Sequence, residues 1–309
     1  MRKRLKRAVR YVFVRALVGL LGLLPLRLAS GLGAVVGRLS YALARRERRK
    51  ALASLERAFP EKSPAEREAL ARACFAHLGR MALELVCVKQ LDRRVDEWVD
   101  WTPESRAAFD AALARKKGVV FVTGHVGNWE LLARRAGLAG YPVFTIAREA
   151  SDPRTTALIE RFRTSGGVRP IWRGRPSAAK EMLRALKNGA FLGLLIDQDT
   201  KVQSVWVPFF GHLAKTPRAA ADLALRTGAA VLTGFCHRVA PHRYRIVMRE
   251  VPLPPGDSDA AVTDLTATLT KAIEDAIREH PEQWVWMHER WKSPPEPSQP
   301  TETTAPSTL

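Results

Sequence analysis

The sequence is poor in the features that mark several common protein classes. Its three cysteines, Cys74, Cys87 and Cys236, form no CxxC pair and lack metal-ligand spacing. This argues against a disulfide framework and predicts reduced, buried thiols, with a catalytic thiol as a weaker alternative. No HExxH, G-x-S-x-G, P-loop or GxGxxG pattern occurs, so a zinc hydrolase, a serine hydrolase and a nucleotide-binding enzyme lack support.

Acidic residues are also scarce. The 309 residues hold 31 Asp and Glu against 50 Lys and Arg, which gives a formal net charge of +19. Residues 1–50 contain 14 of the basic residues and one Glu, and so carry +13 of that charge. A basic arm of this kind indicates binding to an anionic partner, either a membrane surface or a nucleic acid. Its cations alternate with Leu, Val and Gly, not with base-stacking aromatics, so a nucleic-acid binder is the weakest interpretation.

Long, uninterrupted apolar runs are missing from this arm. Its two apolar runs, at 11–26 and 28–44, are interrupted by Arg15 and Arg38, so neither reaches the ~20 apolar residues of a comfortable transmembrane helix. A signal peptide would need a small-residue cleavage site, which is not found. We expect residues 1–50 to be a retained membrane anchor, either shallow or a short span. The alternative is a helical hairpin in the core.

The remaining chain predicts an α/β domain over residues 51–292. Helical patterns at 51–59 and 63–89 are followed, from about residue 105, by alternating strands and helices. This alternation predicts a mixed, largely parallel central sheet covered by helices. The strands are expected at 118–125, 141–147, 191–197, 230–238 and 244–253, and the helices at Pro153–Thr164, 177–187, 217–227 and 260–279. Residues 293–309, rich in Pro, Ser and Thr, are expected to be a disordered tail.

One stretch, VVFVTGHVGNWELL at 119–132, concentrates the candidate chemistry. It predicts a buried strand, His125 at its carboxyl end, a Gly-Asn turn, and a helix with Glu130 in its first turn. Active sites in such folds gather at the carboxyl ends of strands, where Asp197 is also expected. The functional interpretation is that His125 acts as a general base oriented by Glu130. The alternative is a buried histidine in a helix-capping network, and the spacing alone does not separate the two.

Four motifs in a common order resemble those of the bacterial lipid A biosynthesis acyltransferases. They are GHVGNWELL, LLIDQD, VPFFG and PEQWVWMHERWK, and the resemblance spans residues 5–292. These lauroyl or myristoyl transferases belong to the wider lysophospholipid acyltransferase superfamily. The resemblance implies an O-acyltransferase with a His-x4-acidic catalytic pair, which assigns the catalytic roles to His125 and Glu130.

The resemblance also implies two further site residues. An arginine in the helix after the second strand is matched by Arg161 or Arg163, and an aspartate that ends the third strand is matched by Asp197 or Asp199. Taken without the resemblance, the arginines fit a solvated helix face and the aspartates fit a turn. These four residues are therefore candidate substrate-binding residues.

The implied reaction moves an acyl chain from acyl carrier protein or coenzyme A to a hydroxyl of a lipid A precursor. It would take place at the cytoplasmic face of the bacterial inner membrane and need no metal or other cofactor. Backbone N–H groups around Gly127 and Asn128, or Arg161, are candidate donors to the oxyanion. The positive charge suits an acidic carrier protein, anionic lipids and a glycolipid acceptor. Alternatives are another glycolipid or lysophospholipid acceptor, such as a phosphatidylinositol mannoside, or a non-catalytic membrane-binding protein.

Two aromatic groups leave their roles open. VPFFG fits either an apolar loop on the core or a wall against an acyl chain. Trp284, Trp286 and Trp291 fit either the core or a belt at the membrane interface.

Overall fold

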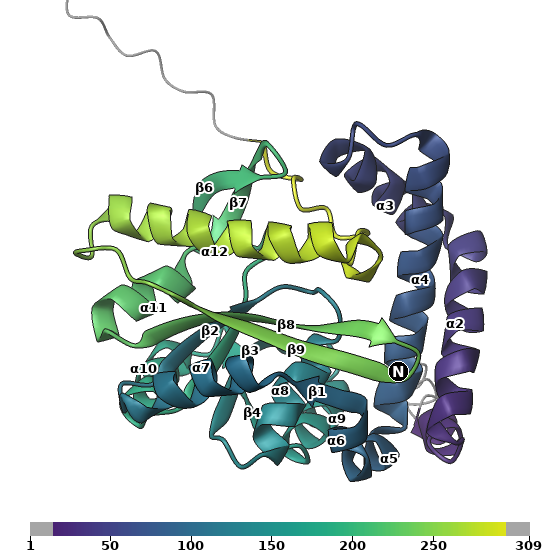
Figure 1. The fold of residues 1–309 in the computed structure, drawn as a ribbon, viewed down its shortest axis with the longest axis horizontal. Helices are drawn as coiled ribbons and strands as arrows, with labels where there is room; N and C mark the ends of the chain where they lie inside the picture. The colour runs from purple at the N-terminus through teal and green to yellow at the C-terminus, as the bar shows by residue number, and fades with distance from the viewer. Residues whose placement is uncertain (1–14, 295–309) are drawn as a thin grey trace, which may run out of the picture.

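The computed structural model describes residues 15–294, which form a central sheet with helices on both faces and a helical group at one end (Figure 1). The strands are β1 (Val99–Trp101), β2 (Val119–Thr123), β3 (Val143–Arg148), β4 (Val168–Arg173), β5 (Phe191–Leu195), β6 (Ser204–Phe209), β7 (His212–Pro217), β8 (Ala230–Ala240) and β9 (Arg243–Val251). The helices are α2 (Leu26–Leu43), α3 (Arg45–Ala58), α4 (Pro64–Val86), α5 (Val88–Arg93), α6 (Val95–Trp98), α7 (Pro103–Ala114), α8 (Trp129–Leu138), α9 (Pro153–Thr164), α10 (Ala178–Lys187), α11 (Ala219–Thr227), α12 (Asp259–Glu279) and a 3-10 turn, η1 (Pro281–Gln283). The first fourteen residues of the expected anchor, and all but two residues of the expected disordered tail, lie outside the described residues.

Seven strands form the main sheet in the order β1-β9-β8-β2-β5-β3-β4. The β8–β9 pair is antiparallel and the other neighbouring pairs are parallel, which confirms the expected mixed, largely parallel sheet. All residues of the central strand β2 are buried. Because successive side chains point to opposite faces, Val120 and Val122 pack with α11 and α12, whereas Val119 and Phe121 pack with α7 and α8. The uninterrupted apolar run thus fits a strand covered on both faces.

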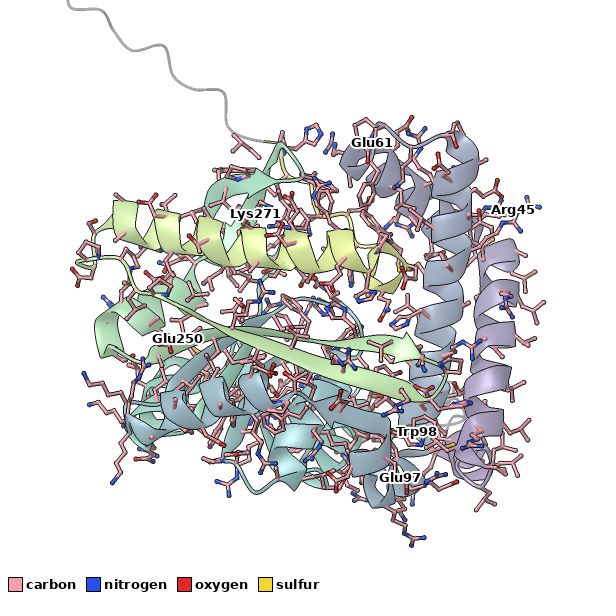
Figure 2. The ribbon with its side chains drawn as sticks, viewed as in Figure 1. Arg45, Glu61, Glu97, Trp98, Glu250 and Lys271 are labelled. Atoms are coloured by element: carbon pink, nitrogen blue, oxygen red, sulfur yellow. The ribbon has the colours of Figure 1, made fainter. Side chains whose placement is uncertain are left out.

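The five strands expected from apolar runs are present as β2, β3, β5, β8 and β9. Helix α9 has the expected bounds, because the Asp152 side chain accepts from Arg154 N–H and Pro153 opens the first turn. A capping box of Ser63 and Glu66 begins α4, at the start of the helix expected at 63–89. Charged side chains such as Lys271 on α12 lie on the outside of these layers (Figure 2).

The VPFFG motif forms the end of β6 and the turn into β7. Phe210 and Gly211 have φ angles of 52° and 75°, as a two-residue turn matched to the twist of a hairpin requires. Phe209 and Phe210 are buried in the core, so the core interpretation of this motif is confirmed. Trp284 and Trp286 are also core residues rather than part of an interfacial belt.

The helical group at one end of the sheet is formed by α2, α3 and α4 (Figure 1). At Gly33, Gly37 and Gly79, an added Cβ would lie 2.1 to 2.3 Å from a backbone oxygen of the opposite helix, either α2 or α4. Only glycine permits two backbones to approach so closely. The inner face of α2 is therefore packed, and the domain boundary expected after residue 50 falls inside α3.

The outer face of α2 and of the helical turns before it is apolar and exposed. Single exposed leucines are common on proteins, but a contiguous patch marks an interaction surface. Among residues 15–294, no helix is both long enough and apolar enough to cross a membrane. We call this patch the α2 outer face; it consists of Leu17, Leu20, Leu23, Leu28, Leu32, Val35, Val36, Leu39 and Leu43.

Candidate active site

The carboxyl ends of β2 and β5 bring His125 and Asp197 together. These strands are parallel neighbours in which Thr123 pairs with Leu195, so the residues two positions beyond each strand meet. His125 Nδ1 lies 2.8 Å from Asp197 Oδ1, and the His125 backbone N–H donates to Asp197 Oδ2 at 2.7 Å. The Asp197 side chain is fully buried, while that of His125 is 20% exposed. The imidazole therefore faces the surface and the carboxylate lies behind it.

The surroundings of Asp197 keep it ionised. Burial alone would raise its pKa, but the charge and hydrogen bonds of His125 and a hydrogen bond from Trp284 together hold the pKa well below its usual value. Trp284 Nε1 donates to Asp197 Oδ2 at 2.8 Å. When the imidazole carries its single proton on Nδ1, that N–H donates to the carboxylate and Nε2 is left free to accept a proton. This is the tautomer that a general base needs.

Glu130 does not hydrogen-bond His125, so the expected contact between them is wrong. Arg163 of α9 binds Glu130 instead, through Nε at 3.2 Å and Nη2 at 2.5 Å. The residue of α8 that contacts His125 is Trp129, at 4.8 Å between ring centroids. Glu130 is the next residue, about 100° further around the helix axis, and therefore points toward α9. Of the two candidate arginines, Arg163 contacts Glu130, while Arg161 is exposed.

The two candidate aspartates have different surroundings. Asp197 binds His125, whereas Asp199 accepts from Ser293 N–H at 3.0 Å through its side chain. The Asp199 carbonyl also accepts from Lys292 Nζ at 2.7 Å. These hydrogen bonds hold residues 292 and 293, in the segment after α12, against the end of β5.

Gly127 and Asn128 build the turn between β2 and α8. Gly127 has a φ of 64°, and an added Cβ would lie 2.1 Å from the Cys236 carbonyl oxygen, so glycine is required there. Asn128 caps α8 by accepting from Leu131 N–H. The N–H groups of Gly127 and Asn128 donate to the carbonyls of Gln283 and Cys236, at 2.9 and 2.8 Å. Both N–H groups thus hold the turn and are not free for the oxyanion role that the sequence suggests.

Two residues beside His125 are not among the site residues expected from the sequence. Gln198 Nε2 lies 3.2 Å from His125 Nε2 and 2.8 Å from His288 Nε2. Burial, together with the nearby charge of His125, lowers the pKa of His288 to about 4, so its neutral ring can accept from Gln198. The sequence offered one signal for these two residues: Gln198 lies in the LLIDQD motif and His288 in the PEQWVWMHERWK motif.

A narrow cavity of about 30 Å³ adjoins the Glu130–Arg163 pair, with room for about one water molecule. Arg163 lines it, and Arg163 Nη1 is buried without a hydrogen-bond partner among the described residues. An unsatisfied guanidinium donor at this place can bind an oxygen atom of a substrate. The apolar part of the lining consists of Phe121, Trp129, Leu132, Ala133, Ile146, Phe191, Gly193 and Leu195.

The three cysteines are free and buried, as expected. Burial raises the pKa of Cys74 to about 12 and raises that of Cys236 above its usual range. The nucleophile in cysteine chemistry is the thiolate, so these neutral thiols disfavour a catalytic role.

The chain matches the family model described as bacterial lipid A biosynthesis acyltransferase over residues 2–293. It is 28% identical to the lipid A biosynthesis lauroyltransferase of Escherichia coli (strain K12) over 279 residues, 88% of each chain. It is 30% identical to the lipid A biosynthesis palmitoleoyltransferase of the same strain over 281 residues, 88% of this chain and 87% of that protein. A phosphatidylinositol mannoside acyltransferase of Mycobacterium tuberculosis (strain ATCC 25618 / H37Rv) is 30% identical over 191 residues, 59% of this chain and 57% of that protein. The chain therefore belongs to the bacterial lipid A biosynthesis acyltransferase family and is an acyltransferase.

Proposed function

We propose that this acyltransferase moves a fatty acyl chain from an acyl thioester to a hydroxyl group of a lipid A precursor. In this proposal His125 is the general base and Asp197 is the carboxylate that orients it. The observation that carries the proposal is the 2.8 Å contact between His125 Nδ1 and Asp197 Oδ1 at the ends of two neighbouring strands. The names of the relatives support the acceptor class.

In the proposed reaction, His125 Nε2 accepts the proton of the acceptor hydroxyl as its oxygen attacks the thioester carbonyl carbon. The carbonyl becomes a tetrahedral oxyanion, the C–S bond breaks, and the leaving thiolate takes the proton back from the imidazolium. Asp197 stabilises that imidazolium while it exists. Gln198, which lies 3.2 Å from Nε2, is displaced by the acceptor hydroxyl. A thioester is already activated, so this step needs no metal or other cofactor.

The Glu130–Arg163 pair is assigned to the oxyanion. Arg163 already uses Nε and Nη2 on Glu130 and has Nη1 unsatisfied. Glu130 fixes the plane of the guanidinium, and Nη1 donates to the carbonyl oxygen as its charge develops. One well-placed donor of this kind contributes about 3 kcal/mol.

The α2 outer face supports a place on a lipid surface, which we assign to the cytoplasmic face of the bacterial inner membrane. Insertion of this face to the depth of the lipid headgroups would bury its leucines and keep the packed glycine side of α2 against α4. The first fifty residues, with +13 of the net charge, would add about 1 kcal/mol for each cation near an anionic surface. An acidic acyl carrier protein is the favoured donor for a chain of this charge, with coenzyme A as the alternative.

Replacement of Leu28, Leu32 and Leu39 by Gln should weaken binding to phosphatidylglycerol-containing vesicles about 100-fold. Each leucine buried in lipid contributes about 1 kcal/mol or more, and about 3 kcal/mol corresponds to roughly two decades in affinity. Vesicle sedimentation measures the effect. The control replaces three exposed leucines outside the α2 outer face, Leu138, Leu158 and Leu183. Equal binding by the two triple variants would contradict the proposed membrane face.

The function itself is tested with the full chain in membranes that contain a labelled lipid A precursor. Thioesters of acyl carrier protein and of coenzyme A, each with several chain lengths, are supplied as donors. Transfer of an acyl chain to the labelled precursor is expected, with one chain length preferred. A phosphatidylinositol mannoside serves as the second acceptor, because three relatives carry that name. Folded protein that acylates neither acceptor from any donor would refute the proposal.

A further inference from the structure

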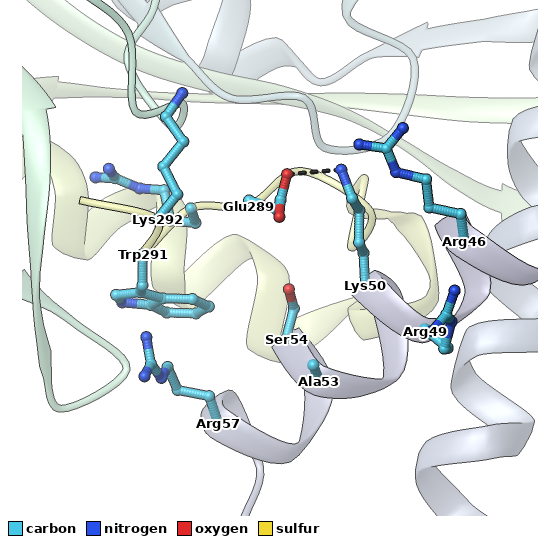
Figure 3. Close-up of a pocket in the computed structure, with 10 residues that line it drawn as sticks. Arg46, Arg49, Lys50, Ala53, Ser54, Arg57, Glu289, Trp291 and Lys292 are labelled. Carbon is cyan, nitrogen blue, oxygen red and sulfur yellow. Dashed lines mark hydrogen bonds and ion pairs between the residues drawn. The ribbon is translucent and has the colours of Figure 1, made fainter. Parts of the chain in front are cut away.

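A groove of about 500 Å³ lies between α3 and the segment after α12 (Figure 3). This volume falls in the range of roughly 300–1,000 Å³ typical of sites for small ligands. One wall is a single face of α3, because its lining residues recur every three or four positions from Arg46 to Arg57. The other wall runs from Glu289 to Lys292. We call this site the α3 groove.

The α3 groove is strongly cationic. Glu289 is its only acidic residue, and Lys50 Nζ binds that carboxylate at 2.6 Å and lowers its pKa below the usual value. Within residues 15–294, no carboxylate forms an ion pair with Arg46 or Arg49, and Figure 3 shows both on the α3 wall. The six cationic lining residues are Arg46, Arg49, Lys50, Arg57, Arg290 and Lys292.

Arg290 adds a buried charge to this groove. Its side chain is fully buried and donates to the Lys215 carbonyl and to Thr216 Oγ1, but Nε has no acceptor among the described residues. Burial lowers its pKa to about 10, so it remains protonated at neutral pH. The charges of Asp197 and Asp199 oppose this lowering only in part. Within residues 15–294 no carboxylate forms an ion pair with Arg290, and a buried guanidinium without one is destabilising. An anion bound in the groove would offset that destabilisation.

The α3 groove begins beside the candidate active site. His288 immediately precedes Glu289, and its ring centroid lies 5.2 Å from that of His125. At the other end of the wall, Lys292 is tied to the Asp199 carbonyl. A molecule whose hydroxyl reaches His125 can therefore place an anionic substituent on the same headgroup in this groove.

We propose that the α3 groove binds a phosphate group on the headgroup of the acceptor lipid. This inference rests on the function proposed above. Guanidinium groups match phosphate oxygens through paired hydrogen bonds, and Arg46 and Arg49, on one helix face, have no ion-pair partner among the described residues. A concave site of this volume accommodates one headgroup. An acidic carrier protein would instead need a contact surface on the order of 800 Å².

The test compares the double variant Arg46→Gln/Arg49→Gln with wild type, using a phosphorylated acceptor and the same acceptor after removal of its phosphate. For wild type, KM should be about 10- to 100-fold lower for the phosphorylated acceptor, as expected for a few charge-assisted hydrogen bonds. In the variant this difference should fall to within about 3-fold, with kcat and the KM for the thioester unchanged. The matched control is Arg45→Gln/Arg48→Gln, which removes two charges from α3 outside the groove. Arg45 lies at the outer margin of the helical group (Figure 2), and Arg48 stacks on Tyr41.

Three results would overturn the inference. A rise in the KM for the carrier-protein thioester alone would make the groove a docking site for the carrier. In the second, both double variants lose the same affinity for anionic vesicles and show no effect of the acceptor phosphate on KM. The groove arginines would then contribute only general surface charge. Equal KM values of wild type for both acceptors would remove any role for the phosphate.

Failure of the proposed function is distinguishable from failure of this inference. If wild type acylates neither acceptor, the proposed function fails. Binding to the groove is then measured separately, by ³¹P NMR titration with inorganic phosphate and with the phosphorylated headgroup. Binding of the headgroup that is weakened in Arg46→Gln/Arg49→Gln and retained in the control supports the groove. Equal weak binding by all three proteins overturns it. Binding of inorganic phosphate without the headgroup also overturns it, because it marks a free-anion site.

Discussion

Replacement of Asp197 by Asn should reduce acyl transfer nearly as much as replacement of His125 by Ala, by about 10²- to 10⁴-fold. His125→Ala removes the proposed general base. Asp197→Asn leaves the imidazole present but replaces the acceptor of Nδ1–H with an amide that can donate, so Nε2 is no longer reliably the free nitrogen. Single-turnover rates measured with a labelled acceptor separate this chemical step from substrate binding. Both variants should bind the acceptor normally.

The matched control is Asp199→Asn, because Asp199 is buried nearby but contacts Ser293 and not His125. Its rate should stay within a few-fold of wild type, and circular dichroism should show that all three variants are folded. Asp197→Asn with a wild-type rate would mean that another group orients the imidazole. In that event the contact at the ends of β2 and β5 would be structural only.

The pKa of Asp197 also limits how pH can act on the site. A carboxyl whose pKa is lower in the folded protein stabilises the fold at pH above its unfolded pKa of about 3.9, and this stabilisation is lost as pH falls through the folded value. The folded pKa of Asp197 lies well below its usual value, so it stays ionised between about pH 5 and 8. Any change of rate in that range must arise from another group.

Glu130→Gln and Arg163→Gln should each reduce the rate about 10- to 100-fold, and the double variant should be only slightly slower than either. The reason is that Glu130 holds Arg163 through two hydrogen bonds, so the loss of one member already disables the other. Residues that act as one unit give strongly non-additive effects. A double-mutant cycle on single-turnover rates measures the coupling.

Arg161→Gln is the matched control for this cycle. Arg161 lies on the same helix two residues before Arg163 but is exposed, so its replacement should leave the rate unchanged. Additive effects of Glu130→Gln and Arg163→Gln would show that they act separately, as in the sequence-based assignment of Glu130 to His125. An unchanged rate in both single variants would remove the pair from the mechanism.

The parts of the fold that the sequence predicted well are those with a strong local signal. β2 and β5 are almost entirely apolar because helices cover both faces of the sheet. Helix α9 begins at Asp152 and Pro153, which cap and open a helix. β4 was missed because it is an edge strand, paired only with β3. Two arginines and Pro170 interrupt the apolar residues of its VRPIWR sequence. An edge strand tolerates these residues, whereas a central strand does not.

In the candidate site, too, only the features with a local sequence signal were predicted. The positions of His125 and Asp197 at strand ends were predicted, because each directly follows an apolar run. Their pairing depends on the parallel register of β2 and β5, which joins segments that no local pattern connects. The resemblance assigned Glu130 to His125 through the His-x4-acidic spacing. The rotation of α8 about its axis decides which residue faces His125, and that residue is Trp129.

The last described segment holds the histidine turn in place, and this orders events during synthesis. Gly127 N–H is bound by the Gln283 carbonyl, and Asp197 is bound by the Trp284 indole. A ribosome that adds about 5–20 residues per second releases α2 and β2 well before it reaches Gln283. His125 and Asp197 therefore lack these supports until the last described segment has been made. Any activity that depends on their arrangement must wait for the synthesis of that segment.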